Sequence, residues 1–272
     1  KYNIDLFMAV DENMTSNKKW TEEFCQLYVD EGLNEIIKWG TLGDAPSVAT
    51  KPEIIEVMKN AGCTYISFGF ESASNKVLND DIEKGQTRAH LQKTLETLKQ
   101  NNMAPISTFM IGNPHENIND LMETVDFWIE NDAAIDPFIC TPYVGSPIFY
   151  DNVDSILGQY DPRLKLVNEK WNNIDKKVIK KWKLAALDTF MKDCGDAFQY
   201  TATVSQYFTI PELFALKHLM FTHDTKRMLE WAHQRYEETQ LPQWKHDEKW
   251  EKYCSICKAE KEITPKIQNT QK

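Results

Sequence analysis

Short apolar runs alternate with amphipathic helical patterns over the first 150 residues of the chain. The runs are rich in aromatic and β-branched residues, as buried strands are, and they cover residues 4–10, 35–39, 65–70, 106–111 and 137–141. Apolar positions recur at helical spacing between them, over residues 17–32, 52–61, 87–101 and 118–131. Strands that alternate with helices in this way predict βα units and a parallel sheet, either open or part of a barrel.

The pattern changes after Tyr150. Residues 151–167 contain Gly158 and Pro162 and few periodic apolar positions, so we expect a loop or linker there. Helical patterns then cover residues 175–193, 211–221, 224–239 and 244–257. We therefore predict a barrel-like domain over residues 1–150, a helical C-terminal region over residues 151–260 and a disordered, polar tail over residues 261–272.

Composition narrows the functional classes. The chain has 272 residues and a formal net charge of −10, and an acidic surface argues against binding to nucleic acid phosphates. No apolar run approaches the length that spans a bilayer. The six cysteines are scattered rather than arranged as a disulfide framework, which predicts a cytoplasmic protein with reduced thiols.

Each predicted strand ends in a polar loop. Because the carboxyl ends of parallel strands meet at one edge of a sheet, we expect these loops to form one shared mouth. The mouth would be lined by Asp11, Glu12, Asn13, Asp44, Glu71, Ser72, Ser74 and Glu116. Carboxylates there suit ribose hydroxyls or a ligand ammonium group, whereas no strand is followed by a glycine-rich loop with lysine that would cradle phosphate. Helix capping and ordinary turns are the alternative explanation of the same residues.

Four segments carry a resemblance to a known family. They are Ala9-Val-Asp-Glu-Asn-Met14, Phe68-Gly-Phe-Glu-Ser-Ala-Ser74, Ile111-Gly-Asn-Pro-His-Glu116 and Pro142-Tyr-Val-Gly-Ser-Pro147. In order and spacing they resemble the radical S-adenosylmethionine (radical SAM) superfamily. Within it they resemble the cobalamin (B12)-associated branch that includes the anaerobic Mg-protoporphyrin IX monomethyl ester cyclase.

The resemblance implies a partial (β/α)6 TIM-like barrel, incomplete at its N-terminus, followed by a helical C-terminal extension. It implies an S-adenosylmethionine site at the mouth of the barrel. Glu71 would bind the ribose with Ser72 and Ser74 nearby. The remaining cofactor contacts would come from Asp11, Glu12 and Asn13 at the methionine group and from Ile111, Gly112, Pro114 and Glu116 around the adenine. Pro142, Tyr143 and Gly145 would shape the substrate pocket.

The superfamily's C-x3-C-x2-C motif, which holds a [4Fe–4S] cluster, does not occur in this sequence. We expect that the sequence begins after the cluster loop, at about the second barrel strand. The cluster ligands, and a cobalamin domain if there is one, would then lie in a missing N-terminal region. The rival interpretation is a degenerate homologue without a cluster.

Cys254 and Cys257 form a C-x2-C pair near the end of the chain. One such pair supplies two ligands, whereas zinc takes four, and His246 lies outside the usual spacing. We therefore favour an ordinary packing pair over a metal site. For His218, His223 and His233 we likewise favour packing or surface roles over ligand binding.

The resemblance thus implies the C-terminal fragment of a radical SAM enzyme that modifies or methylates an unidentified small-molecule substrate. The aromatic-rich C-terminal helices would suit a large apolar substrate. We expect the fragment alone to be inactive, because it lacks the cluster motif. Two alternatives remain open: a catalytically inactive barrel that binds a nucleoside-like ligand or a partner, and a metal-assisted α/β enzyme that uses Asp11, Glu71 and Glu116.

Overall fold

The computed structural model describes residues 4–11, 13–132, 134–143, 146–160 and 203–258. The chain divides into two compact units. Unit 1 comprises residues 1–110, 117–138 and 218–272, and unit 2 comprises residues 111–116 and 139–217. The predicted boundaries of the barrel and the helical region at residues 150 and 260 stay predictions.

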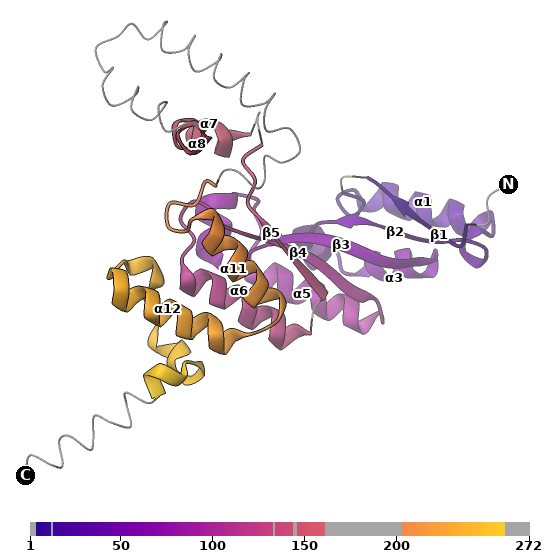
Figure 1. Ribbon diagram of the computed structural model, residues 1–272. Helices are drawn as coiled ribbons and strands as arrows, with labels where there is room; N and C mark the ends of the chain where they lie inside the picture. The colour runs from indigo at the N-terminus through magenta and orange to yellow at the C-terminus, as the bar shows by residue number, and fades with distance from the viewer. Residues whose placement is uncertain (1–3, 12, 133, 144–145, 161–202, 259–272) are drawn as a thin grey trace, which may run out of the picture. The chain divides into compact units, whose positions relative to one another are not determined.

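A five-stranded sheet with the order β1-β2-β3-β4-β5 forms the framework of the fold (Figure 1). β1 and β2, β2 and β3, and β3 and β4 pair in parallel, with Phe7 opposite Trp39, Thr41 opposite Ile66 and Phe68 opposite Ser107. The strands are β1 (Leu6–Ala9), β2 (Lys38–Gly43), β3 (Cys63–Glu71), β4 (Ala104–Ile111) and β5 (Ala134–Ile139). The sequential order of parallel strands with helical crossovers makes a curled half-barrel, as the sequence predicts.

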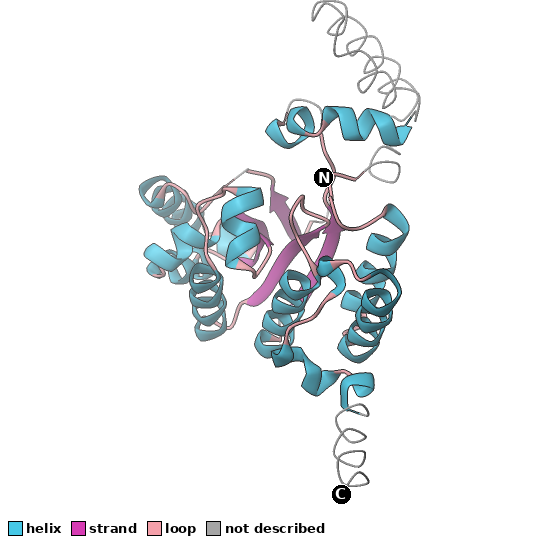
Figure 2. Ribbon diagram, turned by 90° about the vertical axis from the view of Figure 1, so that its left-hand side faces the viewer, coloured by secondary structure: helices cyan, strands magenta, loops and turns pink. Residues whose placement is uncertain are grey.

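Helices connect the strands and flank the sheet (Figure 2). Asn17, Asp44 and Thr87 each accept a hydrogen bond from the first turn of the helix that follows, which fixes where it begins. The helix α1 packs against α3, and α2 packs against α5. The helices of this part are α1 (Lys18–Asp30), α2 (Ala45–Thr50), α3 (Glu53–Asn60), α4 (Asn75–Val77), α5 (Arg88–Gln100) and α6 (Ile118–Asn131), with short turns η1 (Leu33–Glu35) and η2 (Leu78–Ile82).

The core of unit 1 lies between the sheet and these helices. Alternate residues of β3, among them Ile66, Phe68 and Phe70, are at most 1% exposed. The ring of Phe70 meets that of Phe109 edge-on at a centroid distance of 6.0 Å, and Phe109 stacks on Trp128 of α6 at 6.5 Å. Aromatic contacts of this kind tie β3, β4 and α6 together, so the ends of these strands rest on a packed base.

The prediction of a loop or linker over residues 151–167 is wrong for residues 151–160, which the structure describes. The structure has α7 (Pro147–Asp151) and α8 (Val153–Tyr160) there. Ser146 caps α7 by accepting a hydrogen bond from Phe149 N, and Pro147 occupies the first turn. Ser-Pro is a helix start signal, and Phe149 and Ile156 are buried, so local burial outweighs the glycine and proline on which the loop prediction rested.

The C-terminal helices α11 (Ile210–Phe221) and α12 (Thr225–Thr239) agree with the sequence prediction, and Asp224 caps α12. The single helix predicted over residues 244–257 is wrong. Two 3-10 turns, η4 (Pro242–Trp244) and η5 (Glu248–Tyr253), are separated by the extended residues Lys245 and Asp247, and a helical turn follows at residues 255–258. The predicted helix over residues 175–193, the tail over residues 261–272 and Cys194 lie outside the described residues.

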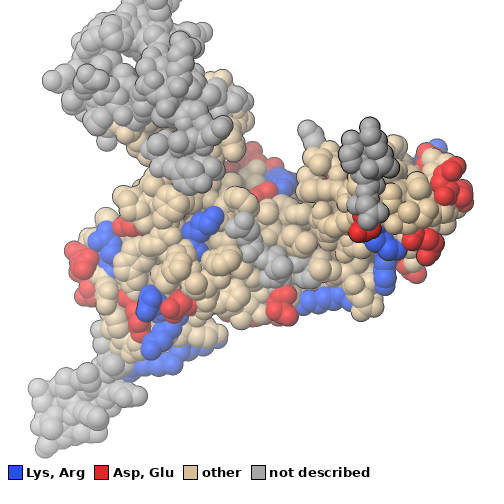
Figure 3. All heavy atoms as spheres, turned by 45° about the vertical axis from the view of Figure 1, so that its right-hand side comes forward, with Lys and Arg blue, Asp and Glu red and all other residues tan. Residues whose placement is uncertain are grey.

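Charged side chains of both signs are interspersed on the face shown in Figure 3. Among the described residues, the ion pairs include Lys18 with Glu53 and Lys249 with Glu123. Among the described residues, no helix is long and apolar enough to cross a membrane. The expected absence of nucleic acid binding stays a prediction.

Candidate functional site

Glu71 is the last residue of β3, and its backbone has a φ of +63°. Few residues other than glycine adopt this conformation, which costs of order 1–3 kcal/mol and is most often found at functional sites. The pairing of β3 with β4 is irregular between Gly69 and Glu71, so the strand bulges where the glutamate leaves it. This local geometry is specified by the tertiary structure and turns the Glu71 side chain away from the regular alternation of the strand.

Lys84 holds the carboxylate of Glu71. Its ammonium group lies 2.9 Å from Glu71 Oε1 and also donates to the carbonyl oxygen of Gly69 at 3.0 Å. Glu71 keeps 22% of its side chain exposed, and its Oε2 accepts no hydrogen bond from any residue that the structure describes. A Cβ atom on Gly69 would lie only 2.5 Å from Glu71 Oε1, so glycine is needed at that position for this arrangement. One carboxylate oxygen is therefore fixed and the other remains available as an acceptor.

Ser72 and Ser74 hold the loop after β3 against α6. The hydroxyl groups of Ser72 and Thr124 lie 3.2 Å apart, and Ser72 Oγ accepts from Ser74 N at 3.1 Å. Ser74 Oγ donates to Asp120 Oδ1 at 2.7 Å, while Lys76 Nζ lies 3.1 Å from Asp120 Oδ2. Both serines are at most 1% exposed, so their hydroxyls support the loop that follows Glu71.

Asn13 belongs to a polar network at the end of β1. Its side-chain amide donates to Asp44 Oδ1, and its Oδ1 accepts from Thr15 Oγ1 at 2.9 Å. Asp44 Oδ2 accepts from Ser47 N at 2.8 Å. Burial alone would raise the pKa of Asp44, but the hydrogen bonds from Ser47, Asn13 and Thr15 outweigh it and lower that pKa below its ordinary value. Asp11 is exposed and accepts from the backbone N–H of Asn13 at 3.1 Å, whereas Glu12 lies outside the described residues.

The turn over residues 111–116 lies in unit 2 and is organised by Glu116. This carboxylate is 1% exposed and accepts from Gly112 N at 2.7 Å and from Asn113 N at 3.3 Å. Gly112 has a φ of +82°, and a Cβ atom there would meet Leu213 at 2.8 Å. The glycine is therefore required both by the backbone and by the close approach of a side chain.

The second loop of unit 2 begins at Thr141. Pro142 is buried, while Tyr143 is exposed and its carbonyl oxygen accepts from Ser146 Oγ at 2.6 Å. Gly145 lies outside the described residues. The structure thus describes the two sets of loops separately, the Asn13 and Glu71 loops in unit 1 and the Gly112 and Tyr143 loops in unit 2.

Residues 9–127 match the family model of the radical SAM superfamily. We call these residues the radical SAM domain, after the family model that they match. The match runs from the last residue of β1 through β2, β3 and β4, and therefore includes the loops that carry Asn13, Glu71 and Glu116. The resemblance inferred from four short segments is thereby confirmed.

Several curated proteins are similar to this radical SAM domain. The anaerobic magnesium-protoporphyrin IX monomethyl ester cyclase of Cereibacter sphaeroides is 26% identical over 157 residues, which cover 57% of this chain and 26% of that protein. An uncharacterised methyltransferase of Pyrococcus horikoshii is 29% identical over 150 residues, covering 55% of this chain and 32% of the relative. The chain therefore spans less than a third of the length of these relatives.

Solved structures of radical SAM proteins are also similar. The methyltransferase TsrM of Kitasatospora setae, solved with cobalamin and a [4Fe–4S] cluster bound, has a TM-score of 0.48 and 14% identity, covering 55% of this chain and 31% of its own. The cobalamin-dependent radical enzyme OxsB has a TM-score of 0.47 and 14% identity, covering 89% of this chain and 37% of its own.

The described cysteines of the radical SAM domain do not fit a [4Fe–4S] cluster. Burial raises the pKa of the Cys25 thiol to about 12, and burial together with the neighbouring Cys25 raises that of Cys63 to about 12. A cluster needs thiolates gathered at one place. Within the residues that the structure describes, the one group of three or more metal-ligating side chains is formed by His233, His246, Cys254 and Cys257.

The sequence did not predict the residues that hydrogen-bond to the loop of Glu71 and hold it in place. Lys84, Asp120 and Thr124 hold the loop of Glu71, but they follow it by between 13 and 53 residues. Asp120 alone carried a signal, because Asn117 and Asp120 have the spacing of a capping box, which the structure contains. The assignment of Asp11, Asn13, Glu71 and the other named residues to a cofactor stays a prediction.

Proposed function

We propose that this chain is the S-adenosylmethionine-binding part of a radical SAM enzyme and that Glu71 accepts hydrogen bonds from the ribose hydroxyls. One observation carries the proposal: a partly exposed carboxylate sits at a strained position at the end of β3, with one oxygen held by Lys84 and the other available. A carboxylate is an acceptor only, so it matches the two hydroxyl donors of a ribose. The family match over residues 9–127 supports the choice of ligand.

The neighbouring residues would hold the ligand-binding loops in place. The hydrogen bonds of Ser72 and Ser74 to α6 would keep the loop after Glu71 in place, and Asn13 with Asp44 would fix the end of β1 near the methionine group. In the turn at residues 111–116, the backbone of Ile111, Gly112 and Pro114 would contact the adenine, with Glu116 maintaining the turn.

The reaction belongs to the complete protein. Since this sequence holds no C-x3-C-x2-C motif, the [4Fe–4S] cluster would be held outside this chain, and we expect the chain alone not to cleave S-adenosylmethionine. The similar cyclase and methyltransferase, together with the family match, support a radical modification or methylation of a small molecule. Cobalamin as a further cofactor is what the resemblance to the cobalamin-associated branch implies.

Binding of S-adenosylhomocysteine, measured by isothermal titration calorimetry on the complete chain, tests the proposal. Glu71→Ala should weaken binding by about 1.5–3 kcal/mol, the range for hydrogen bonds to a charged group. That loss corresponds to roughly a 10- to 150-fold increase in Kd. Glu83→Ala is the matched control, because Glu83 is also a loop glutamate with positive φ but is exposed and lies outside the site.

A deoxyribose analogue separates the hydroxyl contact from a general effect on the loop. If Glu71 accepts from the 2′-hydroxyl, the 2′-deoxy analogue should bind the wild type more weakly but bind Glu71→Ala about as well as the parent ligand does. A 3′-deoxy analogue tests the other hydroxyl in the same way. Equal affinity of wild type and Glu71→Ala for the parent ligand would remove Glu71 from the site.

A further inference from the structure

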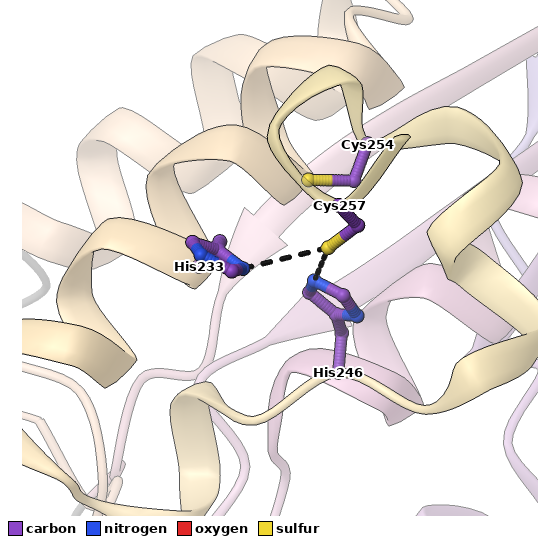
Figure 4. A group of neighbouring side chains, drawn as sticks. All are labelled: His233, His246, Cys254 and Cys257. Carbon is purple, nitrogen blue, oxygen red and sulfur yellow. Dashed lines mark hydrogen bonds between the residues drawn. The ribbon is translucent and has the colours of Figure 1, made fainter. Parts of the chain in front are cut away.

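Four metal-ligating side chains converge in the C-terminal part of unit 1 (Figure 4). They come from three segments: His233 from α12, His246 from the link between η4 and η5, and Cys254 with Cys257 from the turns that follow. One ligand atom from each lies within 4.8 Å of all the others. The C-x2-C pair therefore has two imidazole partners that the spacing along the sequence did not predict.

The separations match those across a single tetrahedral ion. Cys257 Sγ lies 3.4 Å from His233 Nδ1 and 3.5 Å from His246 Nε2. With Zn–S of about 2.3 Å and Zn–N of about 2.0–2.1 Å, a tetrahedral angle places sulfur and nitrogen roughly 3.6 Å apart. Cys257 and the two histidines thus already lie at the separations that a zinc ion requires, and Cys254 lies within 4.8 Å of each of them.

The chemistry and burial of the four groups favour zinc over an iron–sulfur cluster. Two thiolates and two imidazoles are a common structural zinc ligand set. In the two-iron cluster that uses both residue types, cysteines and histidines bind different irons, so thiolate and imidazole would lie further apart than across one ion. Cys254 is 0% exposed and Cys257 is 7% exposed, while His233 and His246 are partly exposed. Four protein side chains already fill a tetrahedral set, as in closed structural sites rather than catalytic ones.

The surrounding contacts keep the ligands in place. Trp244 is 1% exposed and meets Trp231 of α12 edge-on at a centroid distance of 5.0 Å. Ser255, between the two cysteines, is hydrogen-bonded to Glu230 of α12. These contacts fix the segment that carries His246 and the cysteines on the same helix as His233.

The same segment is attached to α6 of the radical SAM domain. Asn119 donates from Nδ2 to the carbonyl oxygen of Lys245 at 3.0 Å and accepts from Asp247 N at 2.7 Å. Lys249 pairs with Glu123 at 2.8 Å. His246 is therefore held between two residues whose backbones are bound to the first turn of α6.

We propose that His233, His246, Cys254 and Cys257 bind one structural zinc ion, which fastens the C-terminal segment to α12 and to α6. The ion has four protein ligands and no open position, so it serves folding and not the reaction. Residues 240–257 contain only short turns, and a metal supplies the stability that such a small segment cannot obtain from its own core.

Metal analysis of the complete chain, purified in zinc-containing medium and passed through a desalting column, tests the proposal. We expect about one zinc ion per chain for a four-ligand site. Cys257→Ser and His246→Gln should each retain less than a tenth of the zinc of the wild type. Cys25→Ser and His218→Gln are matched controls, since Cys25 is a buried thiol in α1 and His218 an exposed imidazole in α11, and both should retain it fully.

Cobalt substitution of the wild type gives a readout that does not depend on variants folding. Co²⁺ should produce the intense visible bands of a tetrahedral ion and sulfur-to-metal charge-transfer absorption in the near ultraviolet. Added zinc should abolish both. A wild type that retains no zinc, a Co²⁺ spectrum without thiolate bands, iron in place of zinc, or full zinc content in His246→Gln would each overturn the proposal.

Discussion

Asp120 should be among the most destabilising positions to truncate in unit 1, because one buried carboxylate contacts three residues in two segments, the loop after β3 and the first turn of α6. It accepts from Ser74 Oγ at 2.7 Å and from Asn117 N at 3.0 Å, and it pairs with Lys76. In Asp120→Ala, the charged hydrogen bond to Ser74 would cost about 1.5–3 kcal/mol. The lost bond from Asn117 N, one half of the capping box, would cost about 0.5–2 kcal/mol, while the N-cap bonds of the Asn117 side chain remain. Lys76 is 46% exposed and regains water, so its pair adds little. We expect a total loss of about 2–5 kcal/mol.

Urea unfolding followed by tryptophan fluorescence measures this loss, since Trp128 lies on the same helix. Glu130→Ala is the matched control. It removes an α6 carboxylate that is 60% exposed and lies 3.5 Å from Arg88, and it should change stability by no more than about 0.5 kcal/mol. A loss below about 1 kcal/mol in Asp120→Ala would refute the argument, because the serine and the helix N-terminus would then not depend on this carboxylate.

Three further outcomes follow from the local geometry. Gly112→Ala should destabilise unit 2 by about 2–5 kcal/mol in urea unfolding, since it adds a steric clash to a positive φ, whereas Gly85→Ala, with a positive φ and open space, should cost only about 1–2 kcal/mol. The lowered pKa of Asp44 adds stability that is present above the pKa of an unfolded aspartate, about 3.9, and is lost as the pH falls through the folded value. Asp44→Asn should therefore show a smaller loss of stability between about pH 5 and pH 2 than the wild type in acid titrations. The Cys25 thiol, with a pKa of about 12, should react with iodoacetamide at pH 8 roughly two to three orders of magnitude more slowly in the folded than in the unfolded chain, which mass spectrometry of the alkylated peptide would reveal.

The sequence predicted the strands that carry large apolar side chains and misplaced one that does not. The expected strand at residues 35–39 is β2, which runs over Lys38–Gly43. Gly40 and Gly43 lie in this strand because side chains of β3 occupy the space beside them, and a Cβ atom on Gly40 would lie 2.2 Å from Tyr65. Because side chains of β3 fill the space beside these glycines, β2 has no apolar residue at those positions, and the pattern of apolar residues does not predict the strand there.

The sequence predicted which residues belong to the candidate site, but it did not predict most of the contacts that these residues make. Glu71 was recognisable as a carboxylate at a strand end, whereas its positive φ and its pairing with Lys84 depend on tertiary structure. The hydroxyl of Ser74 was expected near a ribose, and the structure shows it bonded to Asp120. His233 and His246 could not be joined to the cysteines from the sequence, because the turns between them break the helix that the pattern predicts.

Two adjacent residues in the first turn of α6 bind two different segments of the chain. Asn119 binds the segment at residues 245–247, and Asp120 binds the loop that follows Glu71. A ligand that orders either partner therefore acts on the same helical turn. By thermodynamic reciprocity, zinc would tighten nucleoside binding by the same factor by which the nucleoside tightens zinc binding. The amide protons of this turn would then exchange more slowly with either ligand and slowest with both, which makes them a single reporter of two distant sites.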